Sequence, residues 1–479
     1  MTVPQQYEPH ARATYELAIL DAGTKHPVRQ DYLRLIDSVE LHQVWDGADA
    51  LTLNMRGWDE HDADYRVVGE RIFAPGAQII FRAGYGGVLR TLGRFTVVRP
   101  QPDFSEQGVT VSIQAYDGFH LLMDDTYPGH YGAPPTYTDV ALAIARKRGM
   151  GVVADVSKPI PHEKRKRRRR TRRGRKTKTV GTVIVKNAGD TDAKMVKDLA
   201  NYSGFASPKV RYVETGSPEA RALADTHEVV EGLTDRDVLF FRQLKLSRQK
   251  AEAERYKLTY SRRGGLSTLS KFRPDWDASA VPQAVRVTGF VRKTKQVHVV
   301  EASITTDELR RTGATGPTTI TGRATRRFSK QEAKDFKKGN VPVAVIEILG
   351  DKKPTKAYSP ADGGEVQTMR RETLRAMPIV ATLEELEGIA RGWLELRSDL
   401  HITATAVVRD VPGAETFYPF RVYETEGLPA EYEGNYLVKS ARHVWSGNGH
   451  TVDLQLDKVA EIPPGVVVKG RPKTETPPA

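Results

Sequence analysis

The run Val109-Thr-Val-Ser-Ile-Gln-Ala115 alternates apolar and polar side chains without interruption. Successive side chains of a strand point to opposite faces, so this period of two predicts a β-strand with one buried face. Similar runs, separated by turn residues, occur at 15–20, 38–53, 78–83 and 93–98. Because short turns join antiparallel neighbours, we expect residues 1–130 to form an antiparallel sheet or small barrel.

The hydrophobic period changes after this sheet. One helix is predicted from Thr138, as its N-cap, to Gly149, and a second from Asp190-Thr191 to Gly204. Val238-Leu-Phe-Phe241 suits a buried strand, although the preceding Thr-Asp-Arg-Asp also resembles a helix start. Residues 131–250 are therefore predicted to be a small α/β middle domain.

Strand patterns then return in the last half of the chain. They occur at 256–260, 284–290, 341–349 and 401–456, with one amphipathic helix at 384–397. We expect a second antiparallel β-domain at 251–458 with a polar insertion at 305–375. Residues 459–479 are rich in proline and are predicted to be a flexible tail. The predicted fold class is mainly β with an α+β insert.

The composition is that of a folded protein without cysteine chemistry. Of the 479 residues, 39% are hydrophobic, which suffices for several domains. The absence of cysteine excludes disulfides, thiolate catalysis and cysteine-ligated metals, and it fits folding in a reducing cytoplasm. No stretch approaches the ~20 apolar residues of a membrane-spanning helix.

No motif predicts catalysis, a metal site or a cofactor. Gly84-Tyr-Gly-Gly87 and Gly313-Ala-Thr-Gly316 lack the pattern of phosphate-binding loops, which favours plain turns. Asp59-Glu-His-Asp-Ala-Asp64 offers oxygen ligands but lacks the glycine and distal glutamate of a calcium loop, which favours a polar turn. His227-Glu-Val-Val-Glu231 lacks the second histidine of a zinc protease. We therefore predict that the protein is not an enzyme.

The net charge of +13 comes almost entirely from one segment, predicted to be an exposed loop within residues 162–180. Three interpretations stay open: salt-dependent binding to nucleic acid, docking to an acidic protein surface, or a solvated loop without a partner. The run has no aromatic residue, which argues against a dedicated single-strand binder. Its twelve cationic residues, the candidates for contact with an anionic partner, are Lys164, Arg165, Lys166, Arg167, Arg168, Arg169, Arg170, Arg172, Arg173, Arg175, Lys176 and Lys178.

Several blocks follow one another in an order shared with a known family. They are Phe81-Arg-Ala-Gly-Tyr-Gly-Gly87, residues 111–122, 138–149, 191–205, 266–274 with 284–290, and 434–443 with 449–456. In this order they resemble the phage late control D protein family, the hub of contractile tails, which includes the hub portion of VgrG-like spikes. The basic run and the segment 305–375 depart from the family pattern.

The resemblance implies two tube-like antiparallel β-barrel domains and a structural role. Such a hub is a homotrimer that joins a sixfold tail tube to a threefold spike, since three copies of two similar domains present six units. Its partners would be the tail spike protein, the tail tube or tube-initiator protein and other baseplate components. The protein would be assembled in the bacterial cytoplasm and located in the baseplate of a virion tail or injection particle.

Two other functions remain as alternatives. One is a basic nucleic-acid-binding protein that acts through Lys164–Lys178. The other is a cell-wall hydrolase of the tail tip, which would need convergent carboxylates or a metal cluster, and the sequence shows neither.

Overall fold

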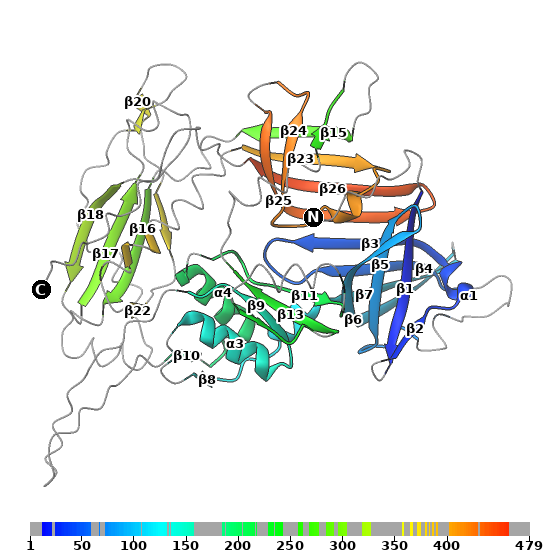
Figure 1. Cartoon of the computed structure of the whole chain (residues 1–479), viewed down its shortest axis with the longest axis horizontal. Helices are drawn as coiled ribbons and strands as arrows, with labels where there is room; N and C mark the ends of the chain where they lie inside the picture. The colour runs from blue at the N-terminus through cyan, green and yellow to red at the C-terminus, as the bar shows by residue number, and fades with distance from the viewer. Residues whose placement is uncertain are drawn as a thin grey trace, which may run out of the picture.

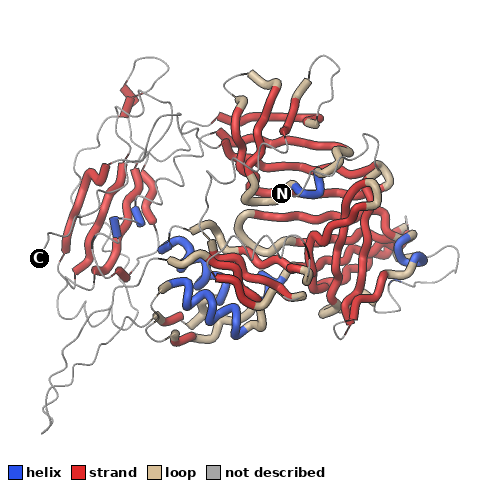
Figure 2. Tube along the Cα trace, in the orientation of Figure 1, coloured by secondary structure: helices blue, strands red, loops and turns tan. Residues whose placement is uncertain are grey.

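The computed structural model describes residues between 12 and 458, with several gaps. The longest gaps are 158–183, 218–228, 243–256, 304–318, 327–356 and 391–401. The described chain is mainly β, which confirms the predicted class, and a small helical unit lies beside large antiparallel sheets (Figures 1 and 2). Within the described part, none of the helices combines the length and hydropathy that crossing a bilayer requires.

The first β-domain is an antiparallel sheet in the spatial order β3-β4-β7-β6-β5-β1-β2. Its strands are β1 (Ala13–Asp21), β2 (Thr24–Pro27), β3 (Ile36–Val44), β4 (Ala50–Arg56), β5 (Gln78–Tyr85), β6 (Val88–Ser105) and β7 (Gly108–Tyr116), with the short helix α1 (Gln30–Leu33) before β3. The alternation that predicts β7 is confirmed, because Val111, Ile113 and Ala115 are buried and the residues between them are partly exposed.

The glycine-rich segment 84–87 is the hairpin turn between β5 and β6. Tyr85 pairs with Val88, and the two residues between them, Gly86 and Gly87, have φ of 58° and 80°. A two-residue hairpin of this kind needs positive φ at both positions, which glycine adopts at little cost. The segment is therefore a plain turn, as predicted, and it directs the buried side chain of Tyr85 toward the second β-domain.

The second β-domain shares one sheet with the first. Its elements are β14 (Lys257–Thr259), β15 (Leu269–Trp276), β23 (Ile402–Arg409), the 3-10 turn η3 (Ala414–Thr416), β24 (Val422–Glu426), β25 (Gly434–Ser446) and β26 (Gly449–Lys458). Strand β25 pairs with β3, from Ser440 opposite Val44 to Ser446 opposite Ser38. The two β-domains thereby form a 13-stranded sheet, which bends over the middle domain in Figure 1.

The middle domain packs two helices on a four-stranded sheet of order β11-β13-β9-β12. Its elements are η1 (Gly118–Leu122), β8 (Gly129–His130), α3 (Tyr137–Lys147), β9 (Gly151–Ala154), β10 (Val185–Lys186), α4 (Asp192–Ser203), β11 (Lys209–Val213), β12 (Val229–Glu231) and β13 (Arg236–Phe241). The apolar faces of α3 and α4 meet Leu239 and Phe241 of β13 in one core. The strand predicted at 238–241 is therefore confirmed.

The predicted N-cap of α3 is wrong by two residues. Thr136 is the cap, and it forms a capping box in which its hydroxyl accepts from the N–H of Asp139 while Asp139 accepts from the N–H of Thr136. Thr138 lies in the first turn and is buried. Its hydroxyl donates to the carbonyl of Asp155 and accepts from the N–H of Ser157, so it fastens α3 to the end of β9.

A separate five-stranded sheet lies between β15 and β23 in the sequence. Its strands are β16 (Ala284–Val291), β17 (Gln296–Ser303), β18 (Thr319–Arg326), β21 (Arg371–Leu374) and β22 (Ile379–Val380), and β19 (Ala357–Tyr358) pairs with β20 (Glu365–Val366) apart from it. Within the helix predicted at 384–397, the described residues 386–387 and 389–390 are helical. The strand predicted at 341–349 and the tail 459–479 lie outside the described residues.

Candidate functional site: the junction of the domains

Strand β25 belongs to both β-domains. Its first half pairs with β24 and its second half pairs with β3, while β26 runs along most of its length. The change of partner coincides with a bulge at Lys439, whose carbonyl accepts a hydrogen bond from the N–H of Trp45 at 2.7 Å. Beyond the bulge, the side chain of Trp445 packs in the core of the first β-domain. Its ring lies edge-on to the ring of Phe81, with centroids 5.0 Å apart.

Two buried histidines lie beside Trp445. His443 is on the same face of β25, and His450 of β26 is directly opposite Trp445 in the hairpin register. The three rings lie within 10° of parallel, with centroids 4.4 Å apart for Trp445 and His450 and 5.4 Å apart for His443 and each of the others. We call Tyr85, His443, Trp445 and His450 the ring cluster.

Both histidines are neutral at pH 7. Burial lowers the pKa of His443 to about 4, although its hydrogen bond to the carbonyl of Phe417 acts in the opposite direction. Burial lowers the pKa of His450 to about 2, and the neighbouring His443 lowers it further. The rings are 0% and 1% exposed, so water offers no stabilisation to a charged form.

A directed chain of hydrogen bonds runs through the ring cluster. His443 Nε2 lies 2.7 Å from the carbonyl oxygen of Phe417, which only accepts, so the proton of this neutral ring is on Nε2. His443 Nδ1 must then accept from His450 Nε2 at 3.2 Å. His450 Nδ1 in turn accepts from the hydroxyl of Tyr85 at 2.7 Å. The chain fixes both tautomers and links β5 of the first β-domain to β25 and β26 of the second.

Two carboxylates, Asp410 and Glu415, lie near this chain of hydrogen bonds. Asp410 accepts a hydrogen bond from the N–H of His450 at 2.7 Å, and the buried Glu415 of η3 lies 3.7 Å from Arg90 of β6. Burial raises the pKa of Tyr85, and the charges of Glu415 and Asp410 raise it further, so the tyrosine stays protonated as the donor of the chain.

A buried lysine ties the middle domain to the first β-domain. Lys209 of β11 donates to the carbonyls of Val44 and Gly47, both at 2.8 Å, and to Asp49 at 2.6 Å. All three of its N–H bonds are therefore used in the turn between β3 and β4. Next to this turn, burial and the charge of Asp49 raise the pKa of Asp117 well above its usual range.

Further ion pairs cross the same boundary. Arg94 of β6 binds Asp237 of β13 through two hydrogen bonds of 2.7 and 3.3 Å. Glu214, just after β11, accepts from Lys25 at 2.7 Å and from Arg82 at 2.6 Å. Burial would raise the pKa of Glu214, but the hydrogen bond from Lys25 and the other cationic and hydroxyl partners outweigh it and lower this pKa.

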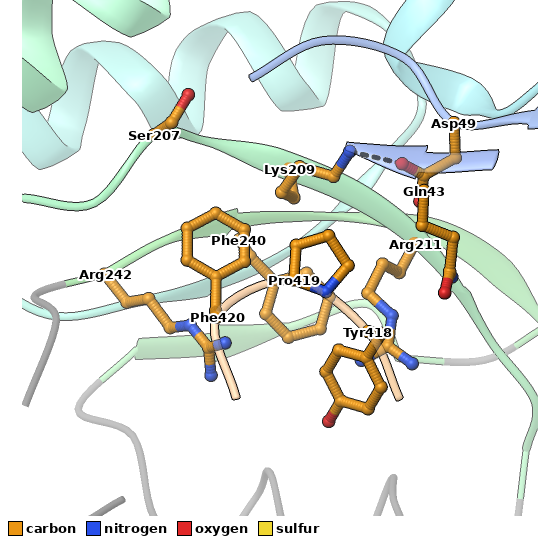
Figure 3. Close-up of a pocket in the computed structure, with 10 residues that line it drawn as sticks. All are labelled: Gln43, Asp49, Ser207, Lys209, Arg211, Phe240, Arg242, Tyr418, Pro419 and Phe420. Atoms are coloured by element: carbon orange, nitrogen blue, oxygen red, sulfur yellow. Dashed lines mark hydrogen bonds and ion pairs between the residues drawn. The ribbon is translucent and has the colours of Figure 1, made fainter. Parts of the chain in front are cut away.

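The three domains meet in a seam of aromatic and cationic side chains (Figure 3). It is lined by Gln43, Asp49, Ser207, Lys209, Arg211, Phe240, Arg242, Tyr418, Pro419 and Phe420. The ring of Phe420 stacks on that of Trp45, with centroids 4.2 Å apart. The guanidinium of Arg211 lies 4.6 Å from the ring centre of Tyr418. The remaining cavity of about 20 Å³ has room for roughly one water molecule, so the seam packs the domains together and offers little space for a ligand.

The predicted site residues fall largely outside this junction. All twelve cationic residues of the run Lys164–Lys178 lie outside the described residues, as do Asp59–Asp64 and Gly313–Gly316. Val229–Glu231 is the strand β12, whereas a zinc protease would carry this motif on a helix. Among the described residues, no three His, Asp or Glu side chains are grouped to hold a metal ion.

The sequence interpretation did not single out the ring cluster or Lys209. One signal for the cluster was available, because Ser446-Gly-Asn-Gly449 separates two strand patterns with a two-residue turn. That register places Trp445 opposite His450. No comparable signal identifies Tyr85 as the partner of His450, since 365 residues separate them.

Comparisons with known proteins give similarity in structure only. No protein-family model and no curated protein matches the chain. A tail protein from Neisseria meningitidis is 11% identical, with a TM-score of 0.49 over 93% of this chain and 96% of its own. The 43 kDa tail protein of prophage MuSo2 from Shewanella oneidensis is 12% identical, with a TM-score of 0.49 over 93% and 98%. A type VI secretion component of Escherichia coli is 9% identical, with a TM-score of 0.43 over 93% and 77%.

Proposed function

We propose that the protein is a structural tail hub of a contractile phage tail or related injection machine, and that it works as a trimer. The observation that carries this proposal is the pairing of β25 with β3, which holds two β-domains of one chain in a single sheet. Two β-domains fixed to each other would repeat as six in a ring of three chains, which suits a sixfold tube on a threefold spike. The sequence blocks that resemble the hub family support the same arrangement.

A hub has to keep its domains in fixed positions, and the junction suits that task. Lys209, Asp237 and Glu214 fasten the middle domain, while the ring cluster fastens the second β-domain. Two of the three end strands of the described sheet, β2 and β15, contain Pro27 and Pro274, and the third, β14, is only three residues long. Proline blocks further strand pairing, so we expect copies of the chain to meet through side chains.

The proposed partners follow from this role. They are a separate spike protein, the tail tube or its initiator, and other baseplate components, with assembly in the bacterial cytoplasm and final location in the baseplate. No catalytic step is part of the proposal. The second candidate, a nucleic-acid-binding protein, is favoured by the twelve cationic residues of Lys164–Lys178.

Light scattering coupled to size exclusion tests both candidates, with the full chain and a variant that lacks residues 164–178. We expect a mass of three times the 53.3 kDa chain, unchanged by the deletion, and electron micrographs with threefold symmetry and six lobes. A monomer that shifts only with duplex DNA, and only when residues 164–178 are present, would support the nucleic-acid-binding protein. A protein that stays monomeric even when co-expressed with a candidate spike protein would contradict the hub.

A further inference from the structure

The contact between the two β-domains contains two neutral imidazoles, and all four of their nitrogen atoms take part in hydrogen bonds. We propose that the ring cluster is an acid-sensitive lock: protonation of His443 and His450 releases β25 from β3 and loosens the second β-domain from the first. The inference rests on the geometry of the junction and does not depend on the hub function.

In the assigned tautomers the hydrogen bond between the two rings already holds its one proton, so an added proton has to break this bond or the bond from Tyr85. His443 Nδ1 already accepts the N–H of His450 at 3.2 Å, so a proton on Nδ1 would set two donors against each other. At the other end, a proton on His450 Nδ1 would force the hydroxyl of Tyr85 to stop donating and find another acceptor in a buried site. With both rings charged, two cations with centroids 5.4 Å apart would be buried together.

The groups facing the cluster do not remove this conflict. Asp410 and Glu415 favour a positive charge nearby, whereas Arg90, close to Glu415, opposes it, and Tyr85 is neutral. Burial is the largest influence on both rings and lowers the pKa to about 4 for His443 and about 2 for His450. Opening the junction to water removes that burial and allows both rings to charge.

We expect the release to be confined to the contact between the two β-domains, because the middle domain is attached to the first β-domain by side chains other than histidine. The second half of β25 reaches the first β-domain through seven residue pairs with β3, through the half-exposed ion pair of Arg442 with Glu40, and through the ring cluster with its two buried histidines. By contrast, lysine, arginine and carboxylate side chains fasten the middle domain to the first β-domain, and carboxylates with lowered pKa, such as Glu214, keep their charge at pH 5.5.

The sign and size of the effect follow from proton linkage. The folded rings bind protons only below about pH 4, whereas exposed rings bind them below about pH 6.5, so the open state takes up more protons between these values. Stability of the junction is therefore complete above pH 6.5 and falls as the pH decreases. At pH 5.5 each exposed histidine raises the opening constant about 10-fold, and the pair raises it about 100-fold.

Hydrogen exchange read by mass spectrometry at pH 7.5 and 5.5, corrected for the intrinsic exchange rate, tests the lock. We expect peptides of β3 and β25 to lose up to about 100-fold protection at pH 5.5 while β9 and β13 keep theirs. The double variant His443→Gln/His450→Gln should lose this pH response. His26→Gln, at an exposed histidine of β2, should retain it.

A second set of variants keeps the test decisive if the double variant does not fold. The single variant His443→Gln should reduce the response from about 100-fold to about 10-fold. Tyr85→Phe removes a hydrogen bond without removing a titrating imidazole, so it should lower protection at pH 7.5 and leave the pH response in place. Equal protection of β3 and β25 at both pH values, or an equal loss in β9 and β13, would overturn the proposal.

Discussion

Lys209 is a middle-domain side chain whose ammonium group is enclosed by the first β-domain. Replacing it with methionine keeps much of its volume but removes the cationic partner of Asp49, which then keeps only the N–H of Val44 as a donor to the oxygen that Lys209 bound, and it removes a donor from two carbonyl groups. Removing one partner of a buried pair typically costs about 3–5 kcal/mol. We expect Lys209→Met to lower the free energy of unfolding by that amount in urea titrations.

A matched control is Lys194→Met on α4. Lys194 pairs with Asp190 at the helix start and its side chain is 60% exposed. Exposed pairs of this kind contribute about 0.5 kcal/mol or less, so this variant should unfold almost as the parent does. Equal losses for the two lysine variants would contradict the role assigned to Lys209.

Gly118 is a second residue whose identity follows from its surroundings. A Cβ at this position would lie 2.7 Å from a carboxylate oxygen of Asp237 and 2.8 Å from a methyl group of Val210. Asp237 is held by Arg94 and Val210 is buried in the core of the middle domain, so neither neighbour moves freely. We expect Gly118→Ala to cost about 1–3 kcal/mol in thermal or urea unfolding. Gly447→Ala, with nothing within 4 Å, should change stability by less than about 0.5 kcal/mol.

At the scale of the element, two threonines at the start of helix α3 have different roles: Thr136 caps the helix and Thr138 attaches it to β9. Thr136→Ala removes the cap and should cost about 1 kcal/mol. Thr138→Ala leaves the carbonyl of Asp155 and the N–H of Ser157 without this buried partner, which should cost about 1–3 kcal/mol. Urea unfolding of the two variants gives the comparison. A larger loss at Thr136 than at Thr138 would mean that the cap contributes more than the attachment to β9.

The same helix shows how far the sequence predicts an element. Its apolar period correctly places Val140 and Ile144 on the buried face. Its start was predicted two residues late because Thr136 and Thr138 are both acceptable caps. The acidic residue three positions after Thr136 is the signature that distinguishes them.

Strand pairing is harder to predict than strand position. The alternation of β7 predicts which residues are buried, but a period of two fits any neighbouring strand equally well. The pairing of β25 with β3 therefore has no local signature, and neither does the contact of His450 with Tyr85. The charge run Lys164–Lys178 is conspicuous in the sequence, yet it lies outside the described residues, so its anionic partner stays a prediction.

At the scale of the whole molecule, Trp445 makes the two β-domains depend on each other for stability. Trp445→Ala would leave a cavity in the core of the first β-domain, although the residue belongs to the second. We expect a loss of about 3–5 kcal/mol and a single unfolding transition for both β-domains. Circular dichroism and tryptophan fluorescence in urea should report the same midpoint.

Trp445→Phe is the conservative control. It retains most of the ring contact with Phe81 and removes an indole N–H that has no hydrogen-bond partner among the described residues. We expect it to cost less than about 1.5 kcal/mol. Two separate transitions, with only the later one shifted by Trp445→Ala, would contradict the mutual dependence of the domains.

The strand shared by the two β-domains also determines when the first β-domain can finish folding during synthesis. Glu40 and Arg442, which pair across the junction, are 402 residues apart. At about 5–20 residues per second, β3 waits roughly 20–80 s on the ribosome before β25 emerges. During this interval the nascent first domain has an open edge and an incomplete core, a state that invites chaperone binding. A chain that terminates before β25 never completes that core. Copies that include β25 therefore differ from shorter ones in having a complete first β-domain before assembly begins.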